Sequence, residues 1–414
     1  MTTIDAGISR PRQGRPWVRP IVAAVTLLAT SALPPFLAGA LAVQIQADLG
    51  FGDRGLGLAV AGFFALAGLT APFGGRVVDR LGWQAGTVIG ALAGASVLLT
   101  IAVAVPSLGA LLAVLVLGGL VHGLTGPTSN LTLATELPVH RYGLGFGVKQ
   151  AAIPIVTMLA GLSVPALALT VGWRWAFGVS ALVPLIAVWA AVSTHRRAPR
   201  PAAGESPPPR PPRRPIPREA LLPLVALSVA GGLGTVSVGS LGTFTVRTAV
   251  EAGLSPGNAG VLVAVGSIAG LVARVSTGWL ADRRGAHGFR WVAVMMTGGA
   301  VGFVLMATSH PVLVAVGAAL AFGAGWGWAG LFILGVVSLY PDAPGAATGV
   351  TQVGTAGGAA VGPLAFGLVV SWIGFGGTWL LIAGITLASA ALLLRSERAR
   401  RASEAEYITK ESNR

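Results

Sequence analysis

Apolar stretches of about 20 residues recur about a dozen times along this sequence of 414 residues, and short polar segments separate them. A helix of about 20 residues crosses a hydrocarbon core about 30 Å thick. Charged residues make up only 10% of the chain, against about a quarter in a typical soluble protein. The sequence therefore predicts an all-α membrane protein, with most of its length inside the bilayer.

One polar segment of the chain occurs twice. The sequence Gly-Arg-Val-Val-Asp-Arg-Leu-Gly at residues 75–82 returns as Gly-Trp-Leu-Ala-Asp-Arg-Arg-Gly at residues 278–285. At nearly the same offset, Gly-Val-Lys-Gln at 147–150 returns as Gly-Val-Thr-Gln at 349–352. This recurrence indicates an internal duplication. Each copy of the first segment follows an apolar stretch and lacks the Lys-Ser or Lys-Thr pair of a phosphate loop, so we expect two tight turns at a membrane face.

The duplication divides the apolar stretches into two sets of six, which predicts twelve transmembrane helices in two pseudo-symmetric bundles. A segment rich in proline and arginine lies between them, typical of a linker, although a peptide ligand for a partner domain is compatible with it. The predicted parts are a cytoplasmic N-terminal tail (1–20), an N-terminal six-helix bundle (21–193), a cytoplasmic linker (194–219), a C-terminal six-helix bundle (220–394) and a cytoplasmic C-terminal tail (395–414).

The net charge of +14 would favour nucleic acid as a partner on a soluble surface, so the position of the charges decides its meaning. With the N-terminus placed inside, the arginine clusters fall on one side of the membrane, and only Arg54, Arg174 and Arg247 fall on the other. This positive-inside pattern places both termini in the cytoplasm of a multi-pass cell-membrane protein. The clusters are also compatible with binding of anionic lipids, and we expect no nucleic-acid partner.

Several classes of protein are poor matches to the sequence. The absence of cysteine excludes disulfides, thiolate catalysis and cysteine metal sites. The first apolar stretch, Ile21 to Val43, is long enough to span and lacks a cleavage pattern, so we expect it to remain as the first helix. Four of the five histidines fall in predicted loops, which disfavours an intramembrane enzyme. We expect no enzymatic activity, no cofactor and no metal.

Two sets of six helices, a long central linker and a Gly-x-x-x-Asp-Arg-x-Gly segment after the second and eighth helices resemble the major facilitator superfamily of secondary transporters. The resemblance covers nearly the whole chain. It places these residues in the family's signature loops: Gly75, Asp79, Arg80, Gly82, Gly278, Asp282, Arg283 and Gly285. It implies transport by alternating access, in which these loops latch the two halves together on the cytoplasmic side in the outward-facing state.

The sequence also departs from the family pattern. Neither signature copy is followed by the usual two basic residues, and Gly119 stands near the position of the helix-four arginine of proton-coupled members. The Gly-Pro motif of drug antiporters is reduced in helix five to Ala-Ile-Pro at 152–154, although Gly362-Pro363 occurs in helix eleven. Drug–proton antiport is therefore a weaker expectation than the resemblance alone implies.

Three ionisable side chains lie at membrane depth, namely His122, Lys149 and Arg274, whereas the carboxylates fall at helix ends or in loops. We predict that Lys149 binds substrate, with Gln150 beside it and Gln352 as the repeat-related amide; the alternative is that Lys149 snorkels to the inner surface. His122 has either a substrate or proton role or a neutral hydrogen bond to a neighbouring helix. Arg274, about one turn before the second signature segment, is expected to serve the cytoplasmic gate, with a substrate role as the alternative.

Arg247 and two tryptophans complete the candidates. Arg247 ends helix seven on the outer side, where it either attracts anions or pairs with Glu251. Trp326 and Trp328 lie in the middle of helix ten, away from the interfacial belts where tryptophan is common. They either wall a substrate cavity or pack against the neighbouring glycines.

The sequence thus predicts a monomeric secondary transporter in the lipid bilayer that works by alternating access on a small-molecule substrate. Because the candidates at membrane depth are cationic or neutral, we expect a small organic or inorganic anion. An exporter of hydrophobic drugs or metabolites is the alternative within the same fold, and a non-transporting receptor or scaffold is a remote one. The substrate, the direction of transport and the coupling ion stay open.

Overall fold

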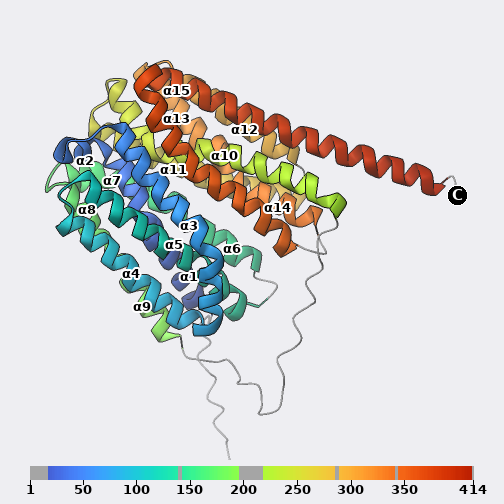
Figure 1. Ribbon diagram of the computed structural model, residues 1–414, viewed down its shortest axis with the longest axis horizontal. Helices are drawn as coiled ribbons and strands as arrows, with labels where there is room; N and C mark the ends of the chain where they lie inside the picture. The colour runs from blue at the N-terminus through green and yellow to red at the C-terminus, as the bar shows by residue number, and fades with distance from the viewer. Residues whose placement is uncertain (1–16, 139–141, 195–217, 285–288, 341–343, 413–414) are drawn as a thin grey trace, which may run out of the picture.

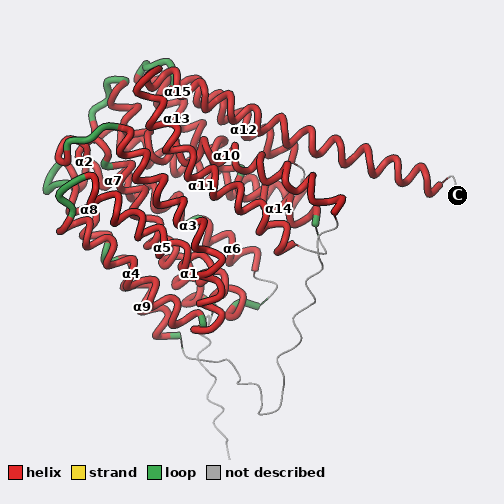
Figure 2. The backbone as a smooth tube through the Cα atoms, viewed as in Figure 1, coloured by secondary structure: helices red, strands yellow, loops and turns green. Residues whose placement is uncertain are grey.

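The computed structural model describes residues 17–138, 142–194, 218–284, 289–340 and 344–412. Every regular element in that part of the chain is a helix, as Figure 2 shows, which confirms the expected all-α fold. The predicted linker and N-terminal tail lie almost wholly outside the described residues. The predicted C-terminal tail begins inside a helix that runs on to Ser412.

The N-terminal half crosses back and forth in six spans. Its elements are α1 (Val18–Ala40), α2 (Ala42–Leu49), α3 (Asp53–Leu81), α4 (Trp83–Ala104), α5 (Leu108–Glu136), α6 (Tyr142–Gln150), α7 (Ala152–Ser163), the π-helical turn η2 (Val164–Ala168), α8 (Trp173–Ser180) and α9 (Val183–Ser193). Because α6, α7 and η2 follow one another along one span, the fifth crossing is a broken helix and not the continuous one expected from its apolar run.

The C-terminal half repeats this plan. Its elements are α10 (Arg218–Glu251), α11 (Pro256–Arg284), α12 (Phe289–Met306), α13 (Pro311–Leu320), the π-helical turn η3 (Ala321–Gly325), α14 (Ala329–Leu339) and α15 (Pro344–Ser412). The described residues contain 11 candidate spans, against the twelve expected. The last candidate has 52 residues and turns back at Gly374, whose φ of 68° favours glycine, so α15 forms two arms (Figure 1).

The signature segments are not the tight turns that the sequence predicted. The first copy is helical through Leu81, and only Gly82 leaves the helix, with φ of 80° and its N–H donating to the Val78 carbonyl at 2.8 Å. The polar residues were misleading because the helix extends beyond its apolar stretch into the polar region. The second copy is likewise helical through Arg284, and Gly285 lies outside the described residues.

The two halves pack along three helix pairs: α3 with α15, α7 with α11, and α1 with α10. Small residues allow this approach, since a Cβ on Gly57 would lie 2.3 Å from the Pro363 carbonyl oxygen and one on Gly161 would lie 2.5 Å from that of Gly260. In Figure 1 the halves lie together at the end that carries α2 and α8 and diverge toward the end that carries α6 and α14. We call the first the Asp53 end and the second the Gly82 end.

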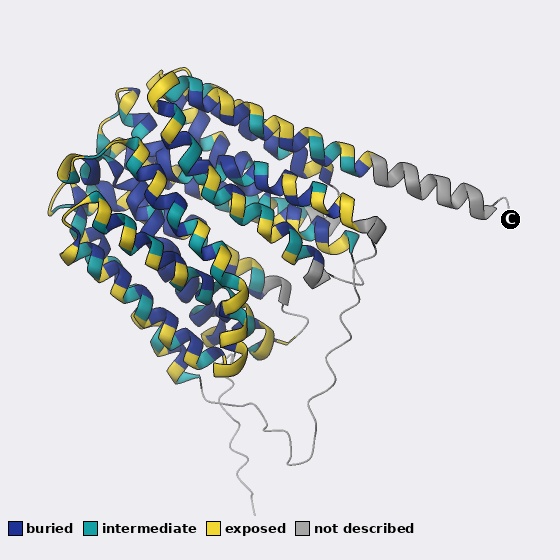
Figure 3. Cartoon of the chain, viewed as in Figure 1, coloured by how far each residue is buried: buried dark blue, intermediate teal, exposed yellow. Residues whose placement is uncertain are grey.

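The outer faces of the helices carry large exposed apolar side chains (Figure 3). The most exposed are Val103, Leu222, Val353, Trp372, Val192 and Leu69. Exposed apolar surface on this scale is unfavourable in water and suits contact with lipid chains. The exposure pattern therefore agrees with the hydropathy of the spans.

Candidate substrate site

An ion pair joins the two halves at the Asp53 end. Arg247, on α10, donates from Nε to Asp53 Oδ1 at 2.9 Å and from Nη2 to Oδ2 at 3.2 Å. Asp53 begins α3 and also accepts from Gln46 Nε2 at 3.0 Å, while the Arg247 guanidinium lies 5.9 Å from the Phe375 ring centre. The expectation that Arg247 has an acidic partner is met, but the acid comes from the opposite half and is not Glu251. This ion pair holds the Asp53 end together.

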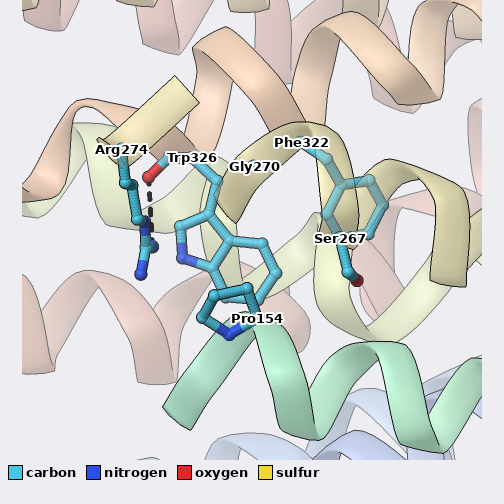
Figure 4. A pocket seen from close by; sticks show the side chains of 6 residues that line it. All are labelled: Pro154, Ser267, Gly270, Arg274, Phe322 and Trp326. Atoms are coloured by element: carbon cyan, nitrogen blue, oxygen red, sulfur yellow. Dashed lines mark hydrogen bonds between the residues drawn. The ribbon is translucent and has the colours of Figure 1, made fainter. Parts of the chain in front are cut away.

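Arg274, on α11, borders a small cavity between the halves (Figure 4). Its Nη2 donates to the Trp326 carbonyl and its Nη1 to the Gln150 carbonyl, both at 3.3 Å. The guanidinium carbon lies 5.8 Å from the Trp326 ring centre, within range of a cation–π interaction. Arg274 therefore borders a cavity as well as bridging the halves, whereas the sequence favoured a gate role over a substrate role.

The sequence explains why the Gln150 carbonyl is available to Arg274. In an uninterrupted helix it would accept from the N–H four residues later, but that residue is Pro154, which has no N–H. The helical hydrogen-bond ladder is interrupted at this carbonyl, while Ala151, between α6 and α7, keeps a helical conformation. The released carbonyl accepts from the other half instead.

Lys149 lies one residue before this carbonyl and is buried, with 7% of the residue exposed. Its Nζ donates to Asn130 Oδ1 on α5 and lies 5.9 Å from the Phe146 ring centre. Among the described residues, neither Lys149 nor Arg274 contacts a carboxylate. Lys149 and Arg274 thus come from opposite halves, and in the described part of the chain both donate only to neutral oxygens.

His122 belongs to a polar cluster within the N-terminal half. Its Nδ1 lies 2.9 Å from Ser31 Oγ, which accepts from Thr125 Oγ1 at 2.7 Å, and its ring lies 5.4 Å from that of Phe63. The hydroxyl of Ser31 also reaches the Leu28 carbonyl at 3.1 Å, which leaves an oxygen lone pair for an N–H at His122 Nδ1. The predicted bond to a neighbouring helix is present, and the proton role stays a prediction.

Of the remaining candidates, only one lines the Arg274 cavity. Trp326 lines the Arg274 cavity, but Trp328 is 1% exposed and packs inside the C-terminal half, with its indole N–H on the Gly325 carbonyl at 2.8 Å. Gln352 is exposed on α15, and nothing described links its side chain to Lys149. The ring of Trp328 packs against Gly234 on α10, and Trp328 lines neither the Arg274 cavity nor the apolar one.

The signature residues lie at the Gly82 end. Asp79 and Arg80 are exposed, as expected where the two halves diverge, and a Cβ on Gly278 would meet nothing within 4 Å. The side chains of Asp282 and Arg283 lie outside the described residues, so the latch predicted from the resemblance stays a prediction.

Sequence reasoning missed an apolar cavity beside the Arg274 cavity. It has a volume of about 40 Å³ and is lined by Pro35, Phe36, Val60, Phe64, Val238, Gly239, Thr243 and Ala359. The lining residues come from α1, α3, α10 and α15, and no periodicity in a single stretch brings them together. The only signal was the pair Pro34-Pro35 in the first helix, which suits a helix that borders a cavity.

Two bundles of membrane-spanning helices that meet around a buried polar and aromatic centre define a polytopic membrane transport protein. The Major Facilitator Superfamily model matches residues 21–350, and the chain belongs to this superfamily. The predicted family is therefore confirmed. No curated protein matches the sequence.

Two solved structures share the fold. The first is a mutant of the nucleoside transporter NupG, 15% identical, with a TM-score of 0.66 over 90% of this chain and 99% of that one. The second is a bacterial homologue of the human lysosomal transporter Spinster in an inward-facing, unoccupied conformation, 14% identical, with a TM-score of 0.69 over 93% of this chain and 96% of that one. At these identities the likeness shows the fold alone, while the family supports secondary transport.

Proposed function

We propose that this protein is a secondary transporter that carries a small anion by alternating access between its two halves. The observation that carries the proposal is a pair of cationic side chains from opposite halves, Lys149 beside Gln150 in the sequence and Arg274 on the Gln150 carbonyl. Lys149 is buried and Arg274 is partly buried, and their hydrogen bonds in the described part of the chain go to neutral oxygens.

A buried cation without a counter-ion is costly, because neutral acceptors replace only part of its hydration. A bound anion would supply the missing charge, and Arg274 presents a planar donor group suited to a carboxylate or an oxyanion. Since the Arg274 cavity is lined by Pro154 of the N-terminal half and by residues of the C-terminal half, an anion bound at Arg274 would lie between the halves. Binding would then be coupled to the relative position of the halves, as alternating access requires.

The ion pair that closes the Asp53 end supports the assignment of this structure to an inward-facing state. If the positive-inside pattern holds, the Asp53 end faces outward and the Gly82 end faces the cytoplasm in the cell membrane. The ion pair at the first and the divergence of the helices at the second then correspond to an inward-facing transporter.

Transport by purified protein in liposomes tests the proposal. Uptake of labelled formate, acetate and nitrate would be compared with that of uridine, a neutral nucleoside. We expect uptake of at least one anion, and a loss of about tenfold or more in Lys149→Ala, Lys149→Gln and Arg274→Gln. Arg290→Gln, which removes an exposed arginine on α12, is the matched control. If both Lys149 variants carry every anion at the wild-type rate, the anion site is wrong.

Export of hydrophobic compounds is the second candidate, and the apolar cavity of about 40 Å³ favours it. Cells that express the protein would gain resistance to hydrophobic antibiotics while their growth on organic acids stayed the same. Uptake of labelled anions together with unchanged antibiotic sensitivity would reject this candidate.

A further inference from the structure

Three aromatic rings stand between the two cavities. Phe36, on α1, stacks on Trp326 with ring centres 5.7 Å apart and an interplanar angle of 28°, and Phe322 lies 5.6 Å from Trp326 on another side. Trp326 lines the Arg274 cavity, and Phe36 lines the apolar cavity. A Cβ on Gly242 would lie 2.9 Å from the Phe36 ring and 3.9 Å from the Trp326 ring, so only glycine leaves the pair this room. The two cavities are thus the two sides of one ring pair contributed by opposite halves.

The Arg274 side of the ring pair presents hydrogen-bond donors. Figure 4 shows the indole nitrogen of Trp326 on the edge of the ring that faces the Arg274 guanidinium. Trp326 Nε1 has no hydrogen-bond partner among the described residues, and an indole N–H can only donate. A carboxylate between them would accept from both groups.

The Phe36 side is almost wholly apolar. Thr243 is the one polar side chain among its lining residues, and its hydroxyl already donates to the Gly239 carbonyl at 2.8 Å. The remaining walls include Val60, Phe64 and Ala359. Such a lining favours a hydrocarbon group over an ion or a hydroxyl.

We infer that the substrate is an organic monocarboxylate with a short apolar tail, whose carboxylate meets Arg274 and Trp326 Nε1 while its tail follows Phe36 into the apolar cavity. The inference rests on the proposed anion transport. That proposal allows organic and inorganic anions, and the apolar cavity selects the organic ones. A cavity of 40 Å³ takes about three groups the size of a water molecule or a methylene. A tail of about three carbons fits, so a four-carbon acid is the expected optimum.

Chain-length selectivity of the full-length protein in liposomes tests this inference. The probes are sodium formate, acetate, propionate, butyrate, hexanoate and octanoate, each competing with labelled acetate, together with sodium nitrate. Each methylene buried in the apolar cavity should lower the inhibitory concentration about fourfold up to butyrate. Longer acids should compete no better than butyrate, and nitrate should compete more weakly than propionate.

Two variants alter the tail cavity without touching the donors. Val60→Ala enlarges it and should move the optimum about one carbon longer, and Ala359→Val narrows it and should move the optimum shorter. Val103→Ala, at an 81% exposed position on α4, is the matched control and should keep the wild-type optimum.

The outcomes separate this inference from the proposed function. If nitrate and formate compete as well as butyrate in the wild type, the tail site is wrong while anion transport stands. An optimum that stays at the same chain length in both cavity variants also overturns the tail site. If no anion is carried or competes, both proposals fall. The wild-type profile decides the matter even if a variant does not fold.

Discussion

The guanidinium of Arg274, on α11, donates to the carbonyl of Gln150, which ends α6 in the opposite half, at 3.3 Å. Pro154 leaves this carbonyl free for the contact, because proline has no N–H to bond it within its own helix. A break in one helix therefore creates the acceptor that positions a cation carried by another.

Replacing Pro154 with alanine tests this dependence. The alanine N–H is expected to bond the Gln150 carbonyl, so that α6 and α7 join and Arg274 loses one of its two acceptors. We expect the anion concentration at half-maximal uptake to rise several-fold, since a neutral hydrogen bond contributes about 1 kcal/mol. Pro184→Ala is the control, because Pro184 lies in the first turn of α9, where no helical N–H is needed. Wild-type uptake in Pro154→Ala would show that the break does not set the site.

Breaking the ion pair of Asp53 and Arg247 should open the Asp53 end. Asp53→Asn leaves Arg247 partly buried without its charge partner. We expect the equilibrium between the closed and open Asp53 end to shift toward the open state by about 1 kcal/mol, or about fivefold. The chain has no cysteine, so a single Thr243→Cys in the apolar cavity reports access through labelling by a membrane-impermeant maleimide from outside. The exchanged pair Asp53→Arg with Arg247→Asp should restore slow labelling. Equal labelling of all three proteins would count against a gate at this pair.

His122 offers a way to separate transport from proton coupling. His122→Gln is expected to keep a hydrogen bond to Ser31 but cannot take up a proton. If His122 carries the coupling proton, the variant should exchange anions at the wild-type rate yet lose the stimulation of uptake by an inward proton gradient. A variant that responds to the gradient as the wild type does would assign His122 a structural role only.

Acid should weaken a second ion pair at the same end of the molecule. Asp48 Oδ2 accepts from Arg174 Nη1 at 2.5 Å and from Trp173 Nε1 at 3.1 Å, and these two bonds lower the pKa of the Asp48 carboxyl. A pKa that is lower in the folded protein than in the unfolded one stabilises the fold at neutral pH, and this contribution is lost as the pH falls through the folded value. We expect thermal unfolding of Asp48→Asn to depend less on pH in the acid range than that of the wild type. Parallel curves would contradict the assignment; because both side chains are well exposed, the effect should be small.

The membrane fold could be predicted because the length of each apolar stretch and the internal repeat can both be read directly along the sequence. The site could be predicted only in part. Lys149 and Arg274 stand out as ionisable residues at membrane depth, but the contact of Arg274 with Gln150 uses a carbonyl that Pro154 leaves free. Trp326 and Trp328 are two positions apart in a helical stretch, so they point to nearly opposite faces, and one lines a cavity while the other is core. The apolar cavity needs four helices in their observed rotations, which no single stretch encodes.

The missing N–H of Pro154 also bears on how the protein moves between its states. When the halves separate at this depth, the Gln150 carbonyl loses Arg274 and has no helical N–H to replace it. Left unsolvated, it would cost about 1–3 kcal/mol, so a water molecule has to reach it as the contact breaks. Separation of the halves at Gln150 therefore requires hydration of this carbonyl. We expect the rate of separation to fall when osmolytes lower the activity of water.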